Sequence, residues 1–112
     1  MASHDAIKDL VSRFNVKDDL KNDGKAWSPS KFQFKPTDAS AYYILFNQDG
    51  SISLNEGETT DAKTTFTAAD QVLEDILSGK LAGVKAFLFG KLKVAGDLAS
   101  AQKLVALLKR AG

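Results

Sequence analysis

Apolar residues recur at helical spacing near the start of the chain. Residues 7–14 place Ile, Leu, Val and Phe at i, i+3, i+4 and i+7 with charged residues between them, which predicts an amphipathic helix with one buried face. Either Ser3 or Asp5 has a side chain suited to cap the N-terminus of this helix. Residues 15–30 are rich in Asp, Asn and Gly, and they predict a turn or short helix followed by a loop.

The spacing then switches to the period of two that strands show. Residues 31–35 alternate strictly between polar and apolar and predict a half-buried strand. Residues 41–47 are mostly aromatic or branched and predict a second strand. The pair Asp49-Gly50 supplies the positive φ of a tight hairpin, so residues 51–54 form the partner strand. The threonine-rich residues 62–67 predict a weaker fourth strand.

Another helical pattern follows this strand directly. Thr67, with Asp70 three residues later, resembles a capping box and predicts a helix start with Thr67 as the N-cap. Gly79 ends the helix. Its apolar face carries Val72, Leu73, Ile76 and Leu77.

The remaining residues alternate once more between the two patterns. Residues 84–88 fit a short helix, residues 91–94 fit a strand, and Gly96 breaks that strand. Asp97 then caps a last helix. The inward residues of that helix are Leu98, Ala101, Leu104, Val105 and Leu108.

The predicted order of elements is α-β-β-β-β-α-α-β-α. Strands in succession with helices at the ends predict an α+β fold, in which helices lie on one face of a mainly antiparallel sheet. The chain has 112 residues, the size of one domain, and no repeat or linker divides it. Residues 1–112 are therefore expected to form a single domain.

Composition excludes several classes of protein. The chain has no cysteine, so disulfides, thiolate metal sites and cysteine nucleophiles are excluded. Its start lacks the apolar h-region of a secretory signal, its end lacks a Ser-Lys-Leu tail, and no apolar run is long enough to span a membrane. We therefore expect a cytoplasmic location.

Catalytic chemistry finds little support in the sequence. His4 is the only histidine and lies near the N-terminus, and no Gly-x-Ser-x-Gly or His-Glu-x-x-His motif occurs. Residues 47–56 resemble part of a calcium loop, but Leu45 would occupy the first ligand position, so we interpret the segment as a hairpin turn. We expect no enzymatic activity, no metal and no cofactor.

Charge is distributed unevenly along the chain. Up to Ser78 there are eight Lys or Arg against thirteen Asp or Glu, whereas from Gly79 onward there are seven against one. A basic end indicates an anionic partner such as a membrane surface, although lysines that only solvate one face would give the same count. Nucleic acid is not expected, because Phe32, Phe34 and Tyr42 alternate as buried strand residues do.

A set of short motifs resembles one known family. Its centre is Gly90-Lys91-Leu92-Lys93-Val94-x-Gly96, which is followed by Ala101-x-Lys103-Leu104 and preceded by a Thr-Phe-Thr strand at 65–67 and by Gly79-Lys80. Residues 62 to about 108 are similar to the sterol carrier protein-2 family. The resemblance implies a five-stranded sheet covered by helices, with an apolar tunnel between the layers. It also implies non-catalytic binding and transfer or presentation of a fatty acid, fatty acyl-CoA, sterol or phospholipid.

If the resemblance holds, the inward apolar residues are candidates for the lining of the apolar tunnel. The family's order would also turn Tyr42 inward, with Tyr43 and Leu45 outward, where they would indicate a homodimer contact or another covered face. Each of the candidates can equally be ordinary core, since periodicity does not separate a filled core from a cavity wall. The candidates are Phe32, Phe34, Ile44, Phe46, Ile52, Leu54, Phe66, Val72, Ile76, Phe87, Leu92, Val94, Leu98, Leu104 and Leu108.

Four lysines are the candidates for polar contacts. Lys80, Lys85, Lys91 and Lys93 lie in the basic part of the chain, and we expect them to favour an anionic membrane or the phosphate of an acyl-CoA. The alternative function is an accessory or protein-interaction module that supports lipid- or isoprenoid-metabolising enzymes, with ligand binding optional.

Overall fold

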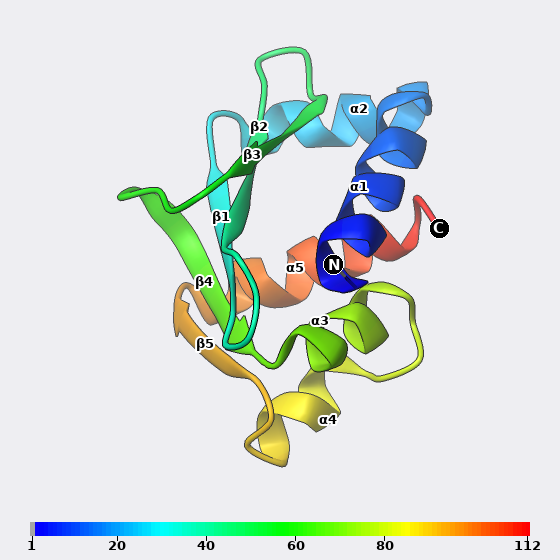
Figure 1. Cartoon of the computed structure of the whole chain (residues 1–112). Helices are drawn as coiled ribbons and strands as arrows, with labels where there is room; N and C mark the ends of the chain where they lie inside the picture. Colours follow the sequence, from blue (N-terminus) through cyan, green and yellow to red (C-terminus); the bar gives the residue numbers. More distant parts are fainter. Residues whose placement is uncertain (1) are drawn as a thin grey trace.

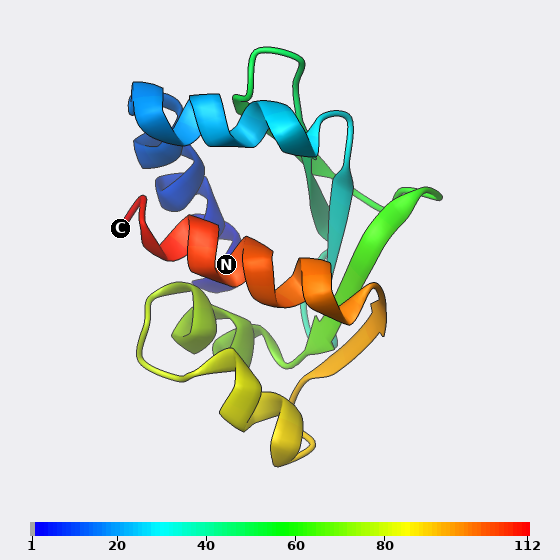
Figure 2. The same ribbon diagram turned by 180° about the vertical axis from the view of Figure 1, so that it is seen from behind.

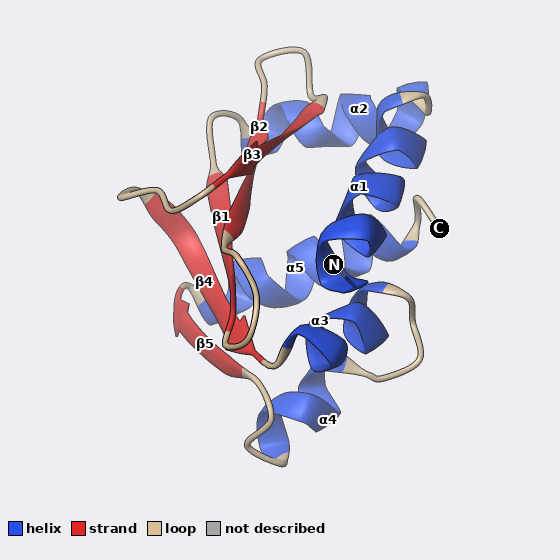
Figure 3. Ribbon diagram, viewed as in Figure 1, coloured by secondary structure: helices blue, strands red, loops and turns tan. Residues whose placement is uncertain are grey.

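A single five-stranded sheet with helices on one of its faces makes up the structure, a computed structural model that describes residues 2–112 (Figure 1). Among these described residues no helix lies on the other face of the sheet (Figures 2 and 3). The helices are α1 (Ala2–Asn15), α2 (Asp18–Gly24), α3 (Asp70–Leu77), α4 (Gly83–Leu88) and α5 (Leu98–Lys109), with a 3-10 turn η1 (Lys25–Trp27) after α2. The strands are β1 (Lys31–Pro36), β2 (Tyr42–Phe46), β3 (Ile52–Glu56), β4 (Ala62–Ala68) and β5 (Lys93–Gly96).

The strands lie in the order β3-β2-β1-β4-β5. β1, β2 and β3 pair as consecutive antiparallel strands, and β5 pairs antiparallel with β4. β4 returns to lie parallel to β1. One parallel pair among four makes the sheet mixed, so the α+β fold class and a mainly antiparallel sheet are confirmed.

The β2–β3 hairpin forms where the turn residues predict it. Gly50 has φ +87° and its N–H donates to Asn47 O at 2.9 Å. The backbone of α2 passes so close that a Cβ on Gly50 would lie 1.7 Å from Lys21 O. Glycine is therefore required here both for its backbone conformation and for this close approach. The predicted phase of β2 is also confirmed, since Tyr42, Ile44 and Phe46 are buried.

Three local expectations are wrong. Thr67 lies inside β4 and does not cap α3; the N–H of Asp70 donates instead to Asp38 Oδ1 at 2.8 Å. Ser3 does not cap the first helix, because it lies within α1. The strand predicted at 91–94 begins at Lys93, because the two preceding N–H groups donate back to Ala86 O in α4.

A polar residue of β1 is buried as well as its apolar ones. Gln33 is 2 % exposed. Its side-chain amide donates to Tyr42 O at 2.9 Å and to Gly57 O at 3.1 Å, and its carbonyl oxygen accepts from the N–H of Thr59 at 2.7 Å. The loop after β3 therefore folds over this side chain and covers the strand.

A buried carboxylate joins α1 to α3. Asp70 accepts hydrogen bonds from the N–H of Ala2 at 3.0 Å and the N–H of Ser3 at 3.2 Å, and also from the Ser3 hydroxyl. Tyr42 donates its hydroxyl proton to Ser3 Oγ at 2.9 Å. Asp70 thus satisfies orphan N–H groups at the start of α1, with a charge that suits the positive end of the helix. The predicted cap of the last helix is local and confirmed, with Asp97 accepting from Ala99 N at 3.0 Å and Ser100 N at 3.2 Å.

Removing the Asp70 carboxylate should destabilise the fold. Asp70→Ala leaves buried donors on Ser3 and at the start of α1 without an acceptor, which should lower the free energy of unfolding by about 2–3 kcal/mol. Asp9→Ala is the matched control, because Asp9 is exposed and forms an ion pair with Arg13 on the same helix; the free energy of unfolding of this variant should stay within about 0.5 kcal/mol of the parent. Urea unfolding of both variants measures this, and equal midpoints would show that the carboxylate does not stabilise the fold.

Tyr42 should make stability fall at alkaline pH. Burial raises the pKa of the Tyr42 hydroxyl above its usual range, so the unfolded chain ionises first, near the ordinary pKa of about 10. Above that pH the unfolded state binds fewer protons than the native state, and the free energy of unfolding falls by up to about 1.4 kcal/mol per pH unit. Tyr42→Phe should be less stable near neutral pH yet show a shallower alkaline slope, and identical slopes would contradict the assignment.

Candidate functional site

The inner face of the sheet divides into a filled half and a hollow half. Over β1 to β3 the space is filled by rings. Trp27 lies with its ring centroid 5.6 Å from Phe32 and 5.4 Å from Phe46, and Phe14 of α1 packs edge-on against Phe46 at 6.1 Å. Edge-to-face and tilted pairs at these distances are ordinary close packing. Close ring packing is therefore the main feature of this half of the sheet.

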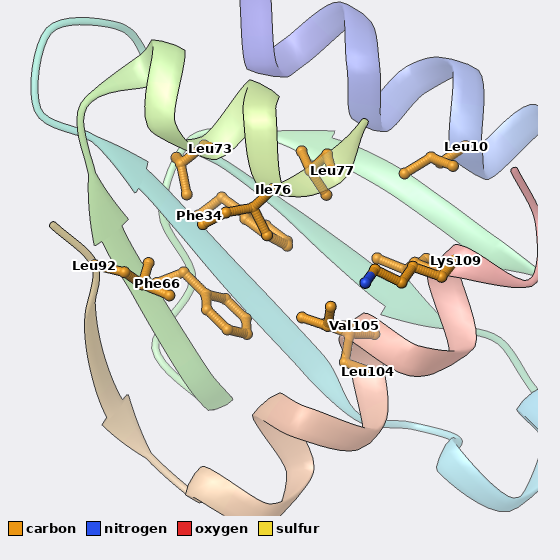
Figure 4. Close-up of a pocket in the computed structure, with 11 residues that line it drawn as sticks. Leu10, Phe34, Phe66, Leu73, Ile76, Leu77, Leu92, Leu104, Val105 and Lys109 are labelled. Atoms are coloured by element: carbon orange, nitrogen blue, oxygen red, sulfur yellow. The ribbon is translucent and has the colours of Figure 1, made fainter. Parts of the chain in front are cut away.

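Toward β4 the packing leaves a small cavity between the sheet, α1, α3 and α5. Its volume is about 30 Å³, above the roughly 10–15 Å³ that a cavity needs to hold a water molecule. Phe34 and Phe66 stack at 5.0 Å along its floor (Figure 4). The lining is Leu10, Phe34, Phe66, Leu73, Ile76, Leu77, Leu92, Leu104, Val105, Leu108 and Lys109.

A larger apolar groove opens between α4 and α5. Its volume is about 470 Å³, within the range of roughly 300–1,000 Å³ that small-molecule sites occupy. Phe66 of β4, Leu92 just before β5 and Val94 of β5 belong to its lining, and one side is open to solvent. The lining is Phe66, Ala82, Gly83, Val84, Phe87, Leu92, Val94, Leu98, Ala101, Gln102, Val105, Ala106 and Lys109. The apolar space that the family resemblance implied as a tunnel is thus an open groove beside a small cavity.

The groove and the cavity share a wall. Phe66, Leu92, Val105 and Lys109 line both hollows. The small cavity therefore lies directly beside the groove, with these four side chains between them.

Polar groups are few in this lining. Gln102 and Lys109 have the only polar side chains among the groove residues. Figure 4 shows the Lys109 ammonium directed into the space between α3 and α5. Within residues 2–112 no ion pair of Lys109 is found, so its charge is available to an anionic group at the edge of the hollow.

The candidate cavity residues fall into two groups. Nine of them line one or both hollows, and six do not. The six line neither hollow, because their side chains pack in or against the core of the domain. The nine are Phe34, Phe66, Ile76, Phe87, Leu92, Val94, Leu98, Leu104 and Leu108. The six are Phe32, Ile44, Phe46, Ile52, Leu54 and Val72.

Several groove residues were missed by the sequence reasoning. Ala101 and Val105 were placed on the inward face of the last helix, but neither was expected at a site. Gln102, Ala106 and Lys109 carried no signal, because they lie on the solvent side of an amphipathic helix by periodicity. Small side chains on one helix face are the feature that could have indicated an unfilled space beside it.

The four candidate lysines lie around α4. Lys80 precedes the helix, Lys85 lies on it, and Lys91 and Lys93 follow it; all four are exposed. None of them lines either hollow. These lysines could therefore contact an anionic group only outside the groove.

Two further features are absent from the described residues, a metal-ligand group and a membrane-spanning helix. Between Ala2 and Gly112 no group of His, Asp and Glu side chains is arranged to hold a metal ion. No helix within the described part of the chain is long and apolar enough to cross a membrane.

Solved structures with the same fold include lipid carriers. A sterol carrier protein 2 from Yarrowia lipolytica, in its apo form, aligns with TM-score 0.70 and 20% identity over 93% of this chain and 87% of that chain. The ubiquinone synthesis protein UbiJ-SCP2 aligns with TM-score 0.74 and 18% identity over 92% and 89%. A sterol carrier protein domain of Helicoverpa armigera reaches 28% identity and TM-score 0.58 over 93% and 85%.

Sequence comparison agrees with these structures. The chain is 40% identical over 76 residues to the peroxisomal multifunctional enzyme A of Dictyostelium discoideum; the match covers 67% of this chain but only 17% of that enzyme. The model of the SCP-2 sterol transfer family matches residues 7–109. Because the family match spans nearly all of the described residues, the chain belongs to the SCP-2 sterol transfer family.

Proposed function

We propose that the chain binds the apolar part of a lipid in the groove between α4 and α5 and carries or presents that lipid without chemical change. The observation that carries the proposal is the apolar groove of about 470 Å³ with only two polar side chains in its lining. Membership of the family supports lipid binding and transfer. Fatty acids, fatty acyl-CoA esters, sterols and phospholipids are the candidate ligands.

The energetics favour a ligand with a long apolar chain. Burying a sixteen-carbon tail contributes about 12 kcal/mol gross at roughly 0.8 kcal/mol per CH₂. Ordering the tail and losing its free motion offset several kcal/mol of that. A remainder of about 8 kcal/mol corresponds to a micromolar dissociation constant, which suits a carrier that has to release its ligand.

Lys109 favours a ligand with an anionic head. Its ammonium is directed into the hollow, whereas Gln102 is the only neutral polar side chain in the groove lining. A carboxylate at this edge would form a charge-assisted hydrogen bond with the ammonium. A fatty acid with its carboxylate at Lys109 and its tail over Phe66 and Leu92 fits both features.

A second candidate function is an accessory module for a lipid-metabolising enzyme. The observation that favours it is the relative from Dictyostelium discoideum, an enzyme in which the segment similar to this chain makes up only 17% of the length. In that arrangement the domain would hold a lipid for a neighbouring catalytic domain or partner. The expected cytoplasmic location, a homodimer and contact with anionic membranes remain predictions alongside both functions.

Native mass spectrometry of the freshly purified chain, followed by displacement of a fluorescent fatty acid, tests the proposal. Excess mass that matches a lipid, together with saturable displacement, would support a carrier. A bare mass and no probe binding would contradict a carrier and leave the accessory module. Binding of the probe only when a partner enzyme is present would favour presentation over free transfer.

Filling the groove should abolish ligand binding. Ala106 is exposed and lines the groove, so the indole of Ala106→Trp would occupy the space of the lipid tail. Affinity for a fluorescent fatty acid should fall at least about tenfold, since several CH₂ groups lose their burial. Ala99→Trp, at an exposed position of the same helix outside the groove, should bind as the parent does. Equal affinities of the two variants would place the ligand elsewhere.

Lys109 should discriminate between head groups. Lys109→Gln removes the charge but keeps hydrogen-bonding capacity, so affinity for palmitate should fall about five- to tenfold, in line with a lost charge-assisted hydrogen bond. Affinity for hexadecanol, which has the same chain length, should change less than twofold. Isothermal titration or probe displacement measures both ligands. A parallel loss for the two ligands would show that Lys109 contributes packing and not charge recognition.

A further inference from the structure

The region of α4 exposes an unusual amount of apolar surface. Val84 is 56 % exposed, Phe87 44 %, Leu88 73 % and Phe89 70 %. We call these four residues the apolar tip. They lie within one short helix and the residue after it, which occupies one end of the molecule (Figures 1 and 2). Apolar residues gathered in this way mark a surface that contacts another apolar phase.

Four lysines lie close to the apolar tip in sequence, and no acidic residue lies among them. Residues 76–96 contain Lys80, Lys85, Lys91 and Lys93 and no Asp or Glu. Within the described part of the chain none of the four lysines forms an ion pair. Exposed aromatic and aliphatic side chains among unpaired lysines are the combination that suits the interface of an anionic membrane.

We propose that the apolar tip docks the protein on anionic lipid surfaces, with Leu88 and Phe89 entering the headgroup region and the lysines contacting lipid phosphates. The inference rests on the proposed function and names the face of the molecule that exchanges lipid with a membrane. Leu88 and Phe89 line neither hollow, so lipid binding does not account for their exposure.

The groove opens at the same place. Val84 and Phe87 belong to the apolar tip and also line the groove. A docked tip therefore brings the groove opening against the bilayer, and an acyl chain can pass between them with little exposure to water. This continuity of apolar surface favours a lipid surface over an unrelated partner.

α4 is held in a way that allows it to respond to docking. Of its residues only Ala86 is buried. The helix is flanked by Gly79 and Gly90, both with positive φ. Ala86 O accepts the N–H groups of Lys91 at 2.8 Å and Leu92 at 3.2 Å. A single anchor residue between two glycine turns permits a small displacement of α4 that would widen the groove.

A second copy of the chain is a poorer occupant of this surface. A two-fold contact through the apolar tip would bring two sets of the four lysines together, and like charges at an interface oppose association. An anionic lipid surface supplies the complementary charge instead. The charge distribution therefore favours the membrane over self-association.

Binding to vesicles tests the proposal. The parent chain should sediment with vesicles of 70% phosphatidylcholine and 30% phosphatidylserine but not with pure phosphatidylcholine. The double variant L88S/F89S should bind the anionic vesicles at least about tenfold more weakly, because two apolar side chains no longer enter the interface. Val16→Ser is the control: Val16 is 80 % exposed in the α1–α2 turn, away from α4, and its variant should bind as the parent does.

The lysines have their own measurement. Lys85→Gln and Lys91→Gln should each weaken binding to the anionic vesicles about fivefold, whereas Lys25→Gln, in the 3-10 turn η1, should change it less than twofold. Raising the salt concentration from 50 to 500 mM should release the parent chain. Equal binding to neutral vesicles, or full binding by L88S/F89S, would overturn the proposal.

Two further readouts separate this proposal from lipid binding itself. Fluorescent fatty acid binding in the absence of vesicles should be the same for L88S/F89S and the parent, because neither residue lines the groove. A parent chain that binds anionic vesicles but no fatty acid would contradict the proposed function and leave the docking surface intact. A parent dimer that L88S/F89S converts to a monomer would show that the apolar tip is a protein contact and would overturn docking.

Discussion

The apolar side chains on the inner face of the sheet have to be buried by the helices that pack on that face. The helices bury the two halves of this face unequally. Over β1 to β3, α1 and η1 bring Phe14 and Trp27 onto Phe32 and Phe46, and large rings fill the space. Over β4 and β5 the cover is α5, whose facing residues include Ala101 and Val105, and the short helix α4. Small side chains and a short helix leave the space between them unfilled, so the groove follows from the unequal cover of one sheet face.

Asp70 connects two of the helices that cover the sheet, α1 and α3. Its carboxylate accepts N–H groups from the start of α1, 67 and 68 residues away in sequence, and its own N–H is held by Asp38. The connection locks α1 and α3 together above Phe34 and Tyr42, where a buried charge that lost its partners would cost several kcal/mol. In α4, by contrast, no side-chain hydrogen bond or ion pair is found among the described residues, and only Ala86 is buried. The molecule thus combines a rigid aromatic half with a lightly held edge.

Local features of this structure can be predicted from its sequence, whereas long-range contacts and unfilled space cannot, for a physical reason. The phase of β2, the hairpin at Asp49-Gly50 and the cap at Asp97 depend on neighbours in sequence, and all three are found. The cap of α1 comes from Asp70 and the cover of Gln33 from the loop at Gly57, and distant partners of that kind leave no local pattern. Periodicity reports the direction in which a side chain points but not whether a neighbour fills the space opposite. Phe32 and Phe66 look alike in sequence, yet one lies under Trp27 and the other lines the groove.

The groove lies beside the apolar tip, and this arrangement has a physical advantage. Apolar surface in water is unfavourable in proportion to its area, so a carrier without cargo benefits from keeping that area in one place. Val84 and Phe87 serve both surfaces, and a single lipid phase that covers the tip also covers the open side of the groove. A groove over β1 to β3 would need a second docking surface, and it would remove the aromatic packing that stabilises these strands. With the proposed docking, the location of the hollow at the edge of the sheet would let one side of the domain exchange lipid while the other remains a packed core.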